Sequence, residues 1–310
     1  MPDDGRGRDA ESPFEIPPRG WFDVAERVVR QLREDNIAIL AAAVAFYLFL
    51  SLIPALGASI ALYGLVSTAD EVTRTIADLT VGLPPAAREL VVAQAEEIGS
   101  REASTLSVGL LVSVSAALFS ASKGTQALVK ALNIAYNESE TRGYVRLRLL
   151  SLGLTVVIAL VVVAGVAAIV KVGNVAAGLP GGGMLVSALR WPALGTVLIG
   201  VLAALYRVSP DRNDPKWRWT TPGAVVAAIL VAVGSLALSF STSNVGDRGE
   251  SGVLGAVGIL LLWLFVSAYV ILVGAELDSE LEHQTAEDST VGPEEPMGER
   301  DAIVADHVAR

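Results

Sequence analysis

The stretch NIAILAAAVAFYLFLSLIPALGASIALYGLV, Asn36–Val66, decides the fold class of this chain. From Ile37 onward its thirty residues include no Asp, Glu, Lys, Arg or His. About 20 predominantly apolar residues are enough for a helix to cross a bilayer. Hydrocarbon offers no hydrogen-bond partners to an exposed backbone, so a single segment of this kind must be helical. The stretch therefore predicts an integral membrane protein.

A proline interrupts this first span. Pro54 has no amide hydrogen, which leaves the carbonyl of Leu50 without its helical partner and predicts a kink or break. Ser51 lies three residues earlier, and its hydroxyl could bond a freed backbone group. We therefore expect Ser51 and Pro54 to mark a bend in the helix.

The composition agrees with a membrane protein. Of the 310 residues, 52% are hydrophobic and only 18% are charged, and the mean hydropathy is +0.53. Cysteine is absent, which excludes disulfides and thiolate metal sites. The net charge of −10 comes mainly from eleven acidic residues between Glu276 and Asp306, so it describes a tail and not a binding face. No basic stripe suggests a nucleic-acid partner.

Five further segments lack charged residues and can cross a membrane, although the one ending at Tyr206 must begin before Trp191. We therefore predict an all-α membrane protein with six transmembrane helices. The predicted spans lie near residues 37–66, 103–122, 149–170, 187–206, 220–241 and 252–275. In this interpretation residues 19–282 form the membrane domain, residues 1–18 a disordered tail, and residues 283–310 an acidic disordered tail.

Three shorter segments have the apolar periodicity of amphipathic helices outside the spans. The first, Trp21–Leu32, either lies in the membrane interface or packs on the bundle as a solvated helix. The second, Pro85–Ile98, is too polar to span and predicts a hairpin or cap on the outer side. The third, Leu128–Ile134, falls in the second cytoplasmic connection and predicts a helix tucked against the bundle.

The distribution of Lys and Arg predicts the orientation. Successive segments outside the spans, from the N-terminus to the connection before the last span, contain six, three, five, two, four and one of these residues. Positively charged segments stay on the cytoplasmic side. The alternation therefore places both termini in the cytoplasm.

Glycines recur at every third residue where the last predicted span begins, from Gly246 to Gly258. Small residues allow two helices to approach closely. The alternative is a loose turn followed by an ordinary glycine-rich helix. We expect close helix contact at Gly255 and Gly258.

Several stretches resemble the YihY/BrkB family of bacterial inner-membrane proteins. They are AAAVAFYLFLSLIPAL (Ala41–Leu56), SASKGTQALVKALNIAYN (Ser120–Asn137), RLRLLSLGLT from Arg146, and GVLGAVGILLLWLFVSAYVILVGAELDSE (Gly252–Glu280). They occur in the family's order and together account for most of Asp35–Glu282. The resemblance implies six helices and a multi-pass location in the inner membrane. It also carries two inherited labels, "ribonuclease BN" and "virulence factor", neither of which describes a mechanism.

The sequence does not favour an enzyme. Metal-assisted cleavage of a phosphodiester needs converging His and carboxylate ligands, yet His283 and His307 both lie in the acidic tail without metal-ligand spacing. No GxxxxGK, GxSxG or HExxH motif is present. Asp211 and Asp214 lie in a short loop among basic residues, which favours a solvated turn. We expect no catalytic activity, no metal and no cofactor.

Polar residues gather at the cytoplasmic ends of the predicted spans, whereas the span interiors contain no charged residue. One interpretation is a polar vestibule for a lipid headgroup or another anionic solute. The alternative is that these side chains only snorkel and complement the helix ends. We also expect Glu276 to pair with Lys123 or Arg207, because a carboxylate at a helix C-terminus needs a nearby cation. The candidate vestibule residues are Asn36, Lys123, Asn133, Asn137, Arg148, Arg207 and Glu276.

Two classes of function follow from these observations. The first is a transporter or lipid-handling protein, with membrane lipids as partners and a cavity between its helices. The second is a non-transporting scaffold that recruits a partner protein. A polar-lined cavity favours the first and a bundle closed on both sides favours the second. The sequence defines neither a substrate nor an oligomeric state.

Overall fold

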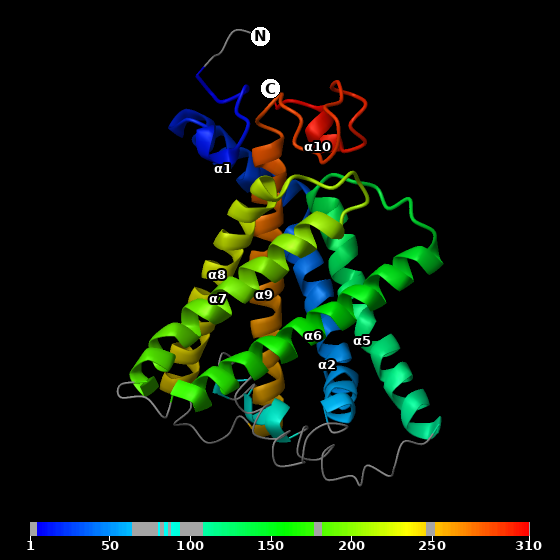
Figure 1. Cartoon of the computed structure of the whole chain (residues 1–310), viewed down its shortest axis with the longest axis vertical. Helices are drawn as coiled ribbons and strands as arrows, with labels where there is room; N and C mark the ends of the chain where they lie inside the picture. The colour runs from blue at the N-terminus through cyan, green and yellow to red at the C-terminus, as the bar shows by residue number, and fades with distance from the viewer. Residues whose placement is uncertain are drawn as a thin grey trace.

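The computed structural model describes residues 5–63, 80, 84–85, 88–93, 108–176, 182–245 and 252–309, and within these residues it is built from helices without a strand. Six helices of 27 to 33 residues form the bundle shown in Figure 1. They are α2 (Ile37–Tyr63), α5 (Val108–Ala135), α6 (Tyr144–Ala176), α7 (Gly182–Val208), α8 (Trp217–Val245) and α9 (Gly252–Glu282).

Four of these helices, α6 to α9, are long and apolar enough to cross a membrane. A fifth candidate arises if α1 (Pro18–Glu34) and the start of α2 count as one bent span. The counts of four and five spans refer to the described residues. By the same test of length and apolar composition, α5 is not a candidate span. The chain is therefore a multi-pass helical protein, and the sixth span remains a prediction. Half of the predicted hairpin at residues 85–98 lies outside the described residues, as do residues 64–66 and 103–107 of the predicted spans.

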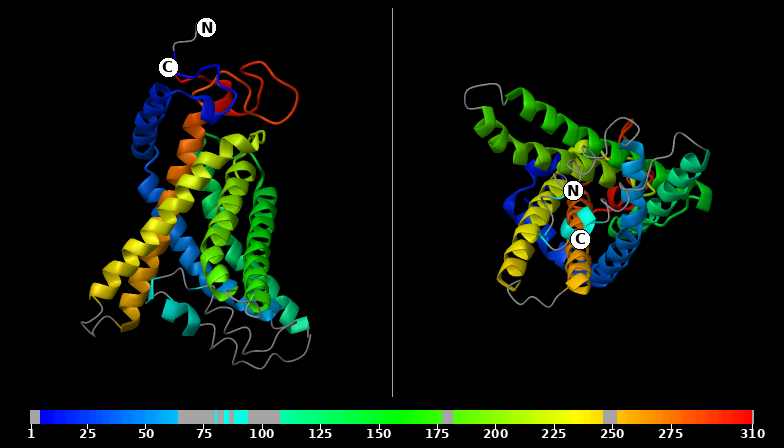
Figure 2. Two further views of the ribbon diagram at one scale, coloured as in Figure 1. Left: turned by 60° about the vertical axis from the view of Figure 1, so that its left-hand side comes forward. Right: turned by 90° about the horizontal axis from the view of Figure 1, so that it is seen from below.

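Helix α9 is the centre of the bundle. It packs against α1, α2, α5 and α8; Figure 1 shows it along the middle of the molecule, and both views in Figure 2 show it beside α8. Leu260 and Leu272 are completely buried, as apolar residues at the centre of a bundle should be. The last turns of α9 lie at the same end of the bundle as the end of α1 and the start of α2. The side chains of these turns therefore contact several helices at once.

Helices α8 and α9 cross at a glycine pair. A Cβ atom at Gly223 would overlap the carbonyl oxygen of Gly274, and one at Gly274 would lie 2.6 Å from the carbonyl oxygen of Gly223. By contrast, a Cβ at Gly258 meets no described residue within 4 Å. No close contact at Gly258 is therefore seen among the described residues, and the contacts predicted at Gly255 and Gly258 stay predictions. Small residues are needed at the opposite end of the helix.

The second cytoplasmic connection also differs from the prediction. Leu128–Ile134 is not a separate helix tucked against the bundle but the last two turns of α5, which continues from Val108 to Ala135. Asn137 lies two residues beyond the end of the helix, and its φ of 56° is a left-handed conformation that asparagine adopts readily. Lys123 therefore lies within a continuous helix instead of at its end.

Helix α1 meets α2 at a bend of 64°. Asp35 ends α1, and Asn36 adopts a φ of 52° before α2 begins. On the apolar face of α1, Val24 and Val28 are buried in a cluster with Trp219 and Leu281. The apolar face of α1 therefore packs on the bundle, while its position relative to the membrane interface stays a prediction.

The described residues of the two terminal segments lie together at one end of the bundle (Figure 1), and the disorder proposed for residues 1–18 and 283–310 stays a prediction. The amide of Ala286 donates to the carbonyl of Arg8 at 2.7 Å, and Ala10 is buried. Arg300 orders the C-terminal segment, because its guanidinium donates to the carbonyl groups of Ala286, Glu287, Glu295 and Ala305. These hydrogen bonds, together with the buried side chains of Ala302, Val304 and Ala305, hold the segment in place.

Candidate functional site

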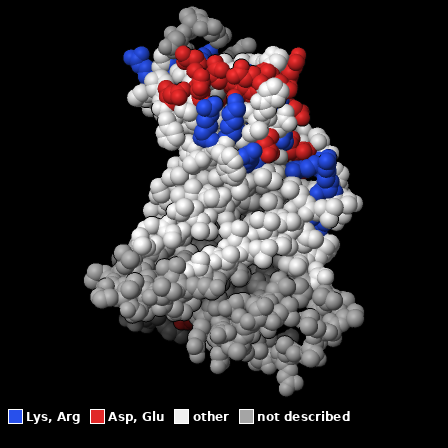
Figure 3. Space-filling view, viewed as in Figure 1, with Lys and Arg blue, Asp and Glu red and all other residues white. Residues whose placement is uncertain are grey.

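Charged side chains gather at one end of the molecule. Figure 3 shows Lys, Arg, Asp and Glu concentrated at the end that carries both termini, above a broad uncharged surface. We call it the charged end; it contains the terminal segments, α1, the loops at 136–143 and 209–216, and the last two turns of α9. All seven candidate vestibule residues lie at or near this end, but the structure does not bring them into a single site.

A pocket of about 370 Å³ opens between α2, α5 and α6 where these helices approach the charged end. Its volume falls within the range of small-molecule sites. We call it the basic pocket, because three of its lining residues are cationic and none is acidic. The lining residues are Tyr47, Phe119, Lys123, Gln126, Ala127, Lys130, Tyr144 and Arg148.

The three cations of the basic pocket come from two helices. Lys123 and Lys130 are exposed and lie two turns apart on α5, which places them on the same face. Arg148, in the second turn of α6, is buried, donates to the carbonyl of Phe119 and has its guanidinium carbon 3.8 Å from the Phe119 ring centroid. Among the described residues, no carboxylate forms an ion pair with any of the three. The pocket therefore offers uncompensated positive charge.

Aromatic side chains form the rim of the basic pocket. Tyr47, Phe119 and Tyr144 are 42%, 50% and 73% exposed, respectively. Tyrosine and tryptophan favour the level of the lipid headgroups, where an apolar ring meets a polar surface. Because the uncharged part of α6 begins just after Arg148, the pocket lies at the boundary between the apolar and charged parts of the bundle.

Contacts between the helices fix the walls of the basic pocket. The hydroxyl of Ser51 donates to the carbonyl of Tyr47 at 2.6 Å and accepts from the amide of Gly124 at 3.1 Å, which joins α2 to α5. A Cβ at Gly124 would lie 2.8 Å from the Leu48 side chain, so the two helices are in close contact there. Ser51 thus bonds backbone groups as predicted, although not the carbonyl freed by Pro54. Helix α2 is unbroken at Pro54, which corrects the expectation of a break, and the kink remains a prediction.

The three predicted asparagines and Arg207 have structural partners outside the basic pocket. Asn36 forms the bend between α1 and α2, and Asn137 lies just beyond the end of α5. Asn133 is buried, donates to Glu140 at 2.8 Å and accepts from the amide of Asp211 at 2.7 Å. Arg207 lies 3.5 Å from the carboxylate of Asp214 and stacks on Trp217. These side chains stabilise helix ends and loops.

The loop at Asp211 is an ordered junction instead of the expected solvated turn. The hydroxyl and amide of Thr141 donate to its carboxylate at 2.6 and 2.7 Å, and Arg142 lies 3.4 Å away. Burial raises the pKa of Asp211, but these donors and the Arg142 charge outweigh burial and lower the pKa below its usual value. The carboxylate therefore joins the connection after α5 to the one after α7.

The predicted ion pair of Glu276 is wrong. Glu276 is completely buried, and no cation in the described part of the chain forms an ion pair with it. Lys123 lies in the basic pocket and Arg207 pairs with Asp214. Glu276 faces the bend between α1 and α2, where its neighbouring side chain is Asp35. The rotation of α9 about its axis, which the sequence leaves open, decided this outcome.

Acidic residues alternate in the last turns of α9, and the sequence analysis missed what this spacing means. Residues four apart share a helix face, so Glu276 and Glu280 face α1, whereas Asp278 and Glu282 face α8 and the loop before it. Each face has one arginine: Arg27 pairs with Glu280, and Arg212 pairs with Glu282 at 2.7 Å. The amide of Gly223 donates to Asp278 at 2.7 Å. The motif GAELDSELE could have indicated these two faces.

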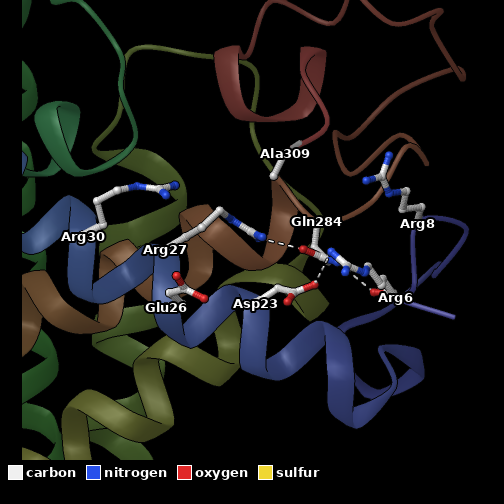
Figure 4. A pocket seen from close by; sticks show the side chains of 8 residues that line it. All are labelled: Arg6, Arg8, Asp23, Glu26, Arg27, Arg30, Gln284 and Ala309. Atoms are coloured by element: carbon white, nitrogen blue, oxygen red, sulfur yellow. Dashed lines mark hydrogen bonds and ion pairs between the residues drawn. The ribbon is translucent and has the colours of Figure 1, made fainter. Parts of the chain in front are cut away.

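A second pocket, of about 190 Å³, lies between α1 and the two terminal segments (Figure 4). Arg27 donates to the side-chain oxygen of Gln284 at 2.7 Å, and Gln284 donates in turn to the carbonyl of Arg6 at 2.8 Å. Arg6 also lies 3.2 Å from Asp23. Since carboxylates already compensate these arginines, the pocket is a joint between the termini and α1, and it is less suited to an anion than the basic pocket.

Comparison with known proteins identifies the family. The sequence profile of the family described as "Virulence factor BrkB" matches residues 28–298, which is most of the chain. The chain belongs to the BrkB family. The matched region contains the basic pocket, the bend at Asp35 and the acidic turns of α9. No solved structure matches this BrkB protein.

Two curated relatives support the assignment to the BrkB family. One is the ribonuclease-like protein YfkH of Bacillus subtilis, which is 30% identical over 194 residues, or 60% of this chain and 69% of the relative. The other is a UPF0761 membrane protein of Tolumonas auensis, which is 31% identical over 102 residues, or 33% of this chain and 32% of the relative. This chain therefore spans about a third of the length of the second relative.

Proposed function

We propose that this BrkB protein binds the anionic headgroups of membrane phospholipids in the basic pocket and moves these lipids between leaflets or presents them to other molecules. In this proposal the charged end is cytoplasmic, the protein crosses the bacterial inner membrane six times, and lipids are its principal partners. The observation that carries the proposal is a pocket with three cations and no acid at the boundary of the apolar surface.

The arrangement of the pocket suits a lipid phosphate. Arg148 is held by the Phe119 carbonyl and ring, so its guanidinium needs little further ordering to bind an anion. Lys123 and Lys130 are exposed and can adjust to the rest of the headgroup. A soluble phosphate would use the same cations, but the exposed aromatic rim adds contacts that only a membrane-embedded molecule makes.

Binding of phosphatidylglycerol to the purified protein tests the proposal. A lysine near the membrane surface contributes about 1 kcal/mol to the binding of an anionic lipid, so K123Q/K130Q should weaken binding by about 30-fold. The matched control is R33Q/R146Q, which removes the same charge from two exposed residues outside the pocket lining. Phosphatidylcholine should bind weakly to all three proteins.

Three results would contradict the proposal. They are equal weakening by the two double substitutions, equal affinity for the two lipids, or displacement of phosphatidylglycerol by millimolar inorganic phosphate, since the last would make the ligand a soluble anion. In vesicles that contain only the purified protein, headgroup-dependent lipid movement is expected for the wild type and reduced movement for K123Q/K130Q.

A scaffold without transport activity is the second candidate. The terminal segments support it, because they form a cap whose exposed acidic surface could recruit a basic partner. Normal lipid binding without any lipid movement in vesicles would favour this candidate.

We also propose that the chain is not a nuclease, although a relative is named ribonuclease-like. In the described part of the chain, no three His, Asp or Glu side chains are placed to hold a metal ion. Purified protein should leave RNA intact with or without added divalent metal. Cleavage that a single substitution abolishes would contradict this proposal.

A further inference from the structure

Glu276 is the one acid in the last turns of α9 without a basic or amide partner. Its side chain is completely buried, and neither carboxylate oxygen makes a hydrogen bond of standard geometry within the described residues. One carboxylate oxygen of Asp35 is likewise buried and makes no hydrogen bond of standard geometry within the described residues. The two side chains are neighbours across the contact between α9 and the bend that joins α1 to α2.

The charges around Glu276 do not compensate it. The groups that act on it are Asp35 and Glu280, both acidic, and Glu34 adds a further negative charge beside Asp35. Arg27 of α1 is engaged by Glu280 and Gln284, and His283 lies 3.8 Å from Glu280. In the described part of the bundle, no cation from α2, α5 or α8 forms an ion pair with Glu276.

Two adjacent carboxylates in a dry setting cannot both stay ionised without a cation. One proton resolves the conflict, because a protonated carboxyl group becomes a donor and the ionised carboxylate beside it is an acceptor. Aspartic acid pairs of this kind titrate as a unit and not as two independent groups. The same pairing would give a partner to the unsatisfied oxygen of Asp35 and to one of the two unsatisfied oxygens of Glu276.

We propose that Asp35 and Glu276 form a proton-binding site at the bend between α1 and α2, in which one proton is shared by the two carboxyl groups. When the site is protonated, its net charge is −1 and α1 stays bent onto α9. When the proton leaves, two negative charges face each other beside Glu280, and their repulsion separates the bend from α9. The proton goes to solvent through Asp35, which is only partly buried.

The position of the site gives protonation a mechanical effect. Asp35 belongs to the 64° bend, where the left-handed Asn36 connects two rigid helices. On the other side of the bend, Arg27 attaches α1 to Glu280 and Gln284 of the C-terminal region. When the proton leaves, the repulsion acts on α1 between the bend at Asn36 and the attachment at Arg27. It therefore changes the angle between α1 and α2. The inference does not depend on lipid binding in the basic pocket, to which Asp35 and Glu276 do not contribute.

Infrared difference spectroscopy of the full-length protein tests the site. The carbonyl stretch of one protonated carboxyl group per chain should persist at a pH at which exposed carboxyl groups are ionised, and it should disappear in a single step as the pH rises. E276Q and D35N should each lose this band. The matched control, E34Q, changes an exposed neighbouring acid and should keep the band.

A second measurement tests the movement. The chain has no cysteine, so a spin-label pair can be introduced at Phe22 of α1 and Ile134 of α5, both of which are exposed. The distance between the labels should change over the pH step in which the infrared band is lost. In E276Q, which mimics the protonated form, the distance should stay at its low-pH value.

Several outcomes would overturn the proposal. Absence of the band in the wild type, or its retention in both E276Q and D35N, would mean that the pair holds no proton. A label distance that changes equally with pH in wild type and E276Q would separate the movement from this site. Strong stabilisation by sodium at constant pH, absent in E276Q, would mean that a metal cation and not a proton occupies it.

Discussion

Replacing Arg212 by methionine should destabilise the protein more than any comparable surface change. The side chains of Arg212 and Glu282 are both 0% exposed, and their charged atoms lie 2.7 Å apart. Burial lowers the pKa of Arg212, but the adjacent Glu282 outweighs it and raises the pKa, so the guanidinium remains charged. With Arg212→Met, Glu282 retains, among the described residues, only the Ser289 hydroxyl as a donor, at 2.8 Å. Breaking a buried pair on one side costs about 3–5 kcal/mol.

The size of the effect depends on the charge left behind, not on the contact that is lost. The double substitution R212M/E282M leaves no buried charge, and it should recover a large part of the stability lost in R212M. Reversible unfolding in detergent, measured on wild type, both single variants and the double variant, gives the coupling free energy. The matched control is R30M, because Arg30 and Glu34 are 3.9 Å apart and more than half exposed. Its effect should be about 0–1 kcal/mol.

Additive effects would refute the reasoning. If R212M and E282M changed the free energy of unfolding independently, the two side chains would not form a buried pair. An R212M effect as small as that of R30M would show that water reaches Glu282. A double variant less stable than either single variant would mean that packing, and not charge, dominates this junction.

Three further predictions concern other parts of the chain. G223A should lower the unfolding temperature by several degrees, because a Cβ would overlap α9, whereas G258A, where a Cβ would meet no described residue, should be neutral or stabilising. The pKa of Asp211 is lower in the folded protein, so its contribution to stability is fully present above its unfolded-state value of 3.8 and is lost as the pH falls through the folded value. The stability advantage of wild type over D211N should therefore shrink below about pH 4; a constant difference would contradict this. Single cysteines at Ser100 and Ser139 should label from opposite sides of the membrane, with Ser100 outside, and labelling of both from one side would exclude the predicted topology.

The sequence alone determined the membrane character and most helix positions. Long stretches without charge can only become helices in a bilayer, so the approximate limits of α2, α6, α8 and α9 follow from composition. It also placed Lys123 and Arg148 at corresponding levels of neighbouring helices, because each lies next to an uncharged segment. These properties depend on local composition and chain order, which do not require knowledge of how the helices pack.

The tertiary structure decided which side chains meet. Helix α9 is apolar on all sides along its spanning part, so no apolar stripe indicates which face turns toward which neighbour. Its rotation placed Glu276 beside Asp35 instead of Lys123 or Arg207, and its crossing with α8 selected Gly223 for close contact. The arrangement of the C-terminal segment likewise depends on Arg300 reaching carbonyl groups that only the folded chain brings together. Rotation and crossing are set by the combined packing of several helices, and no single segment contains that information.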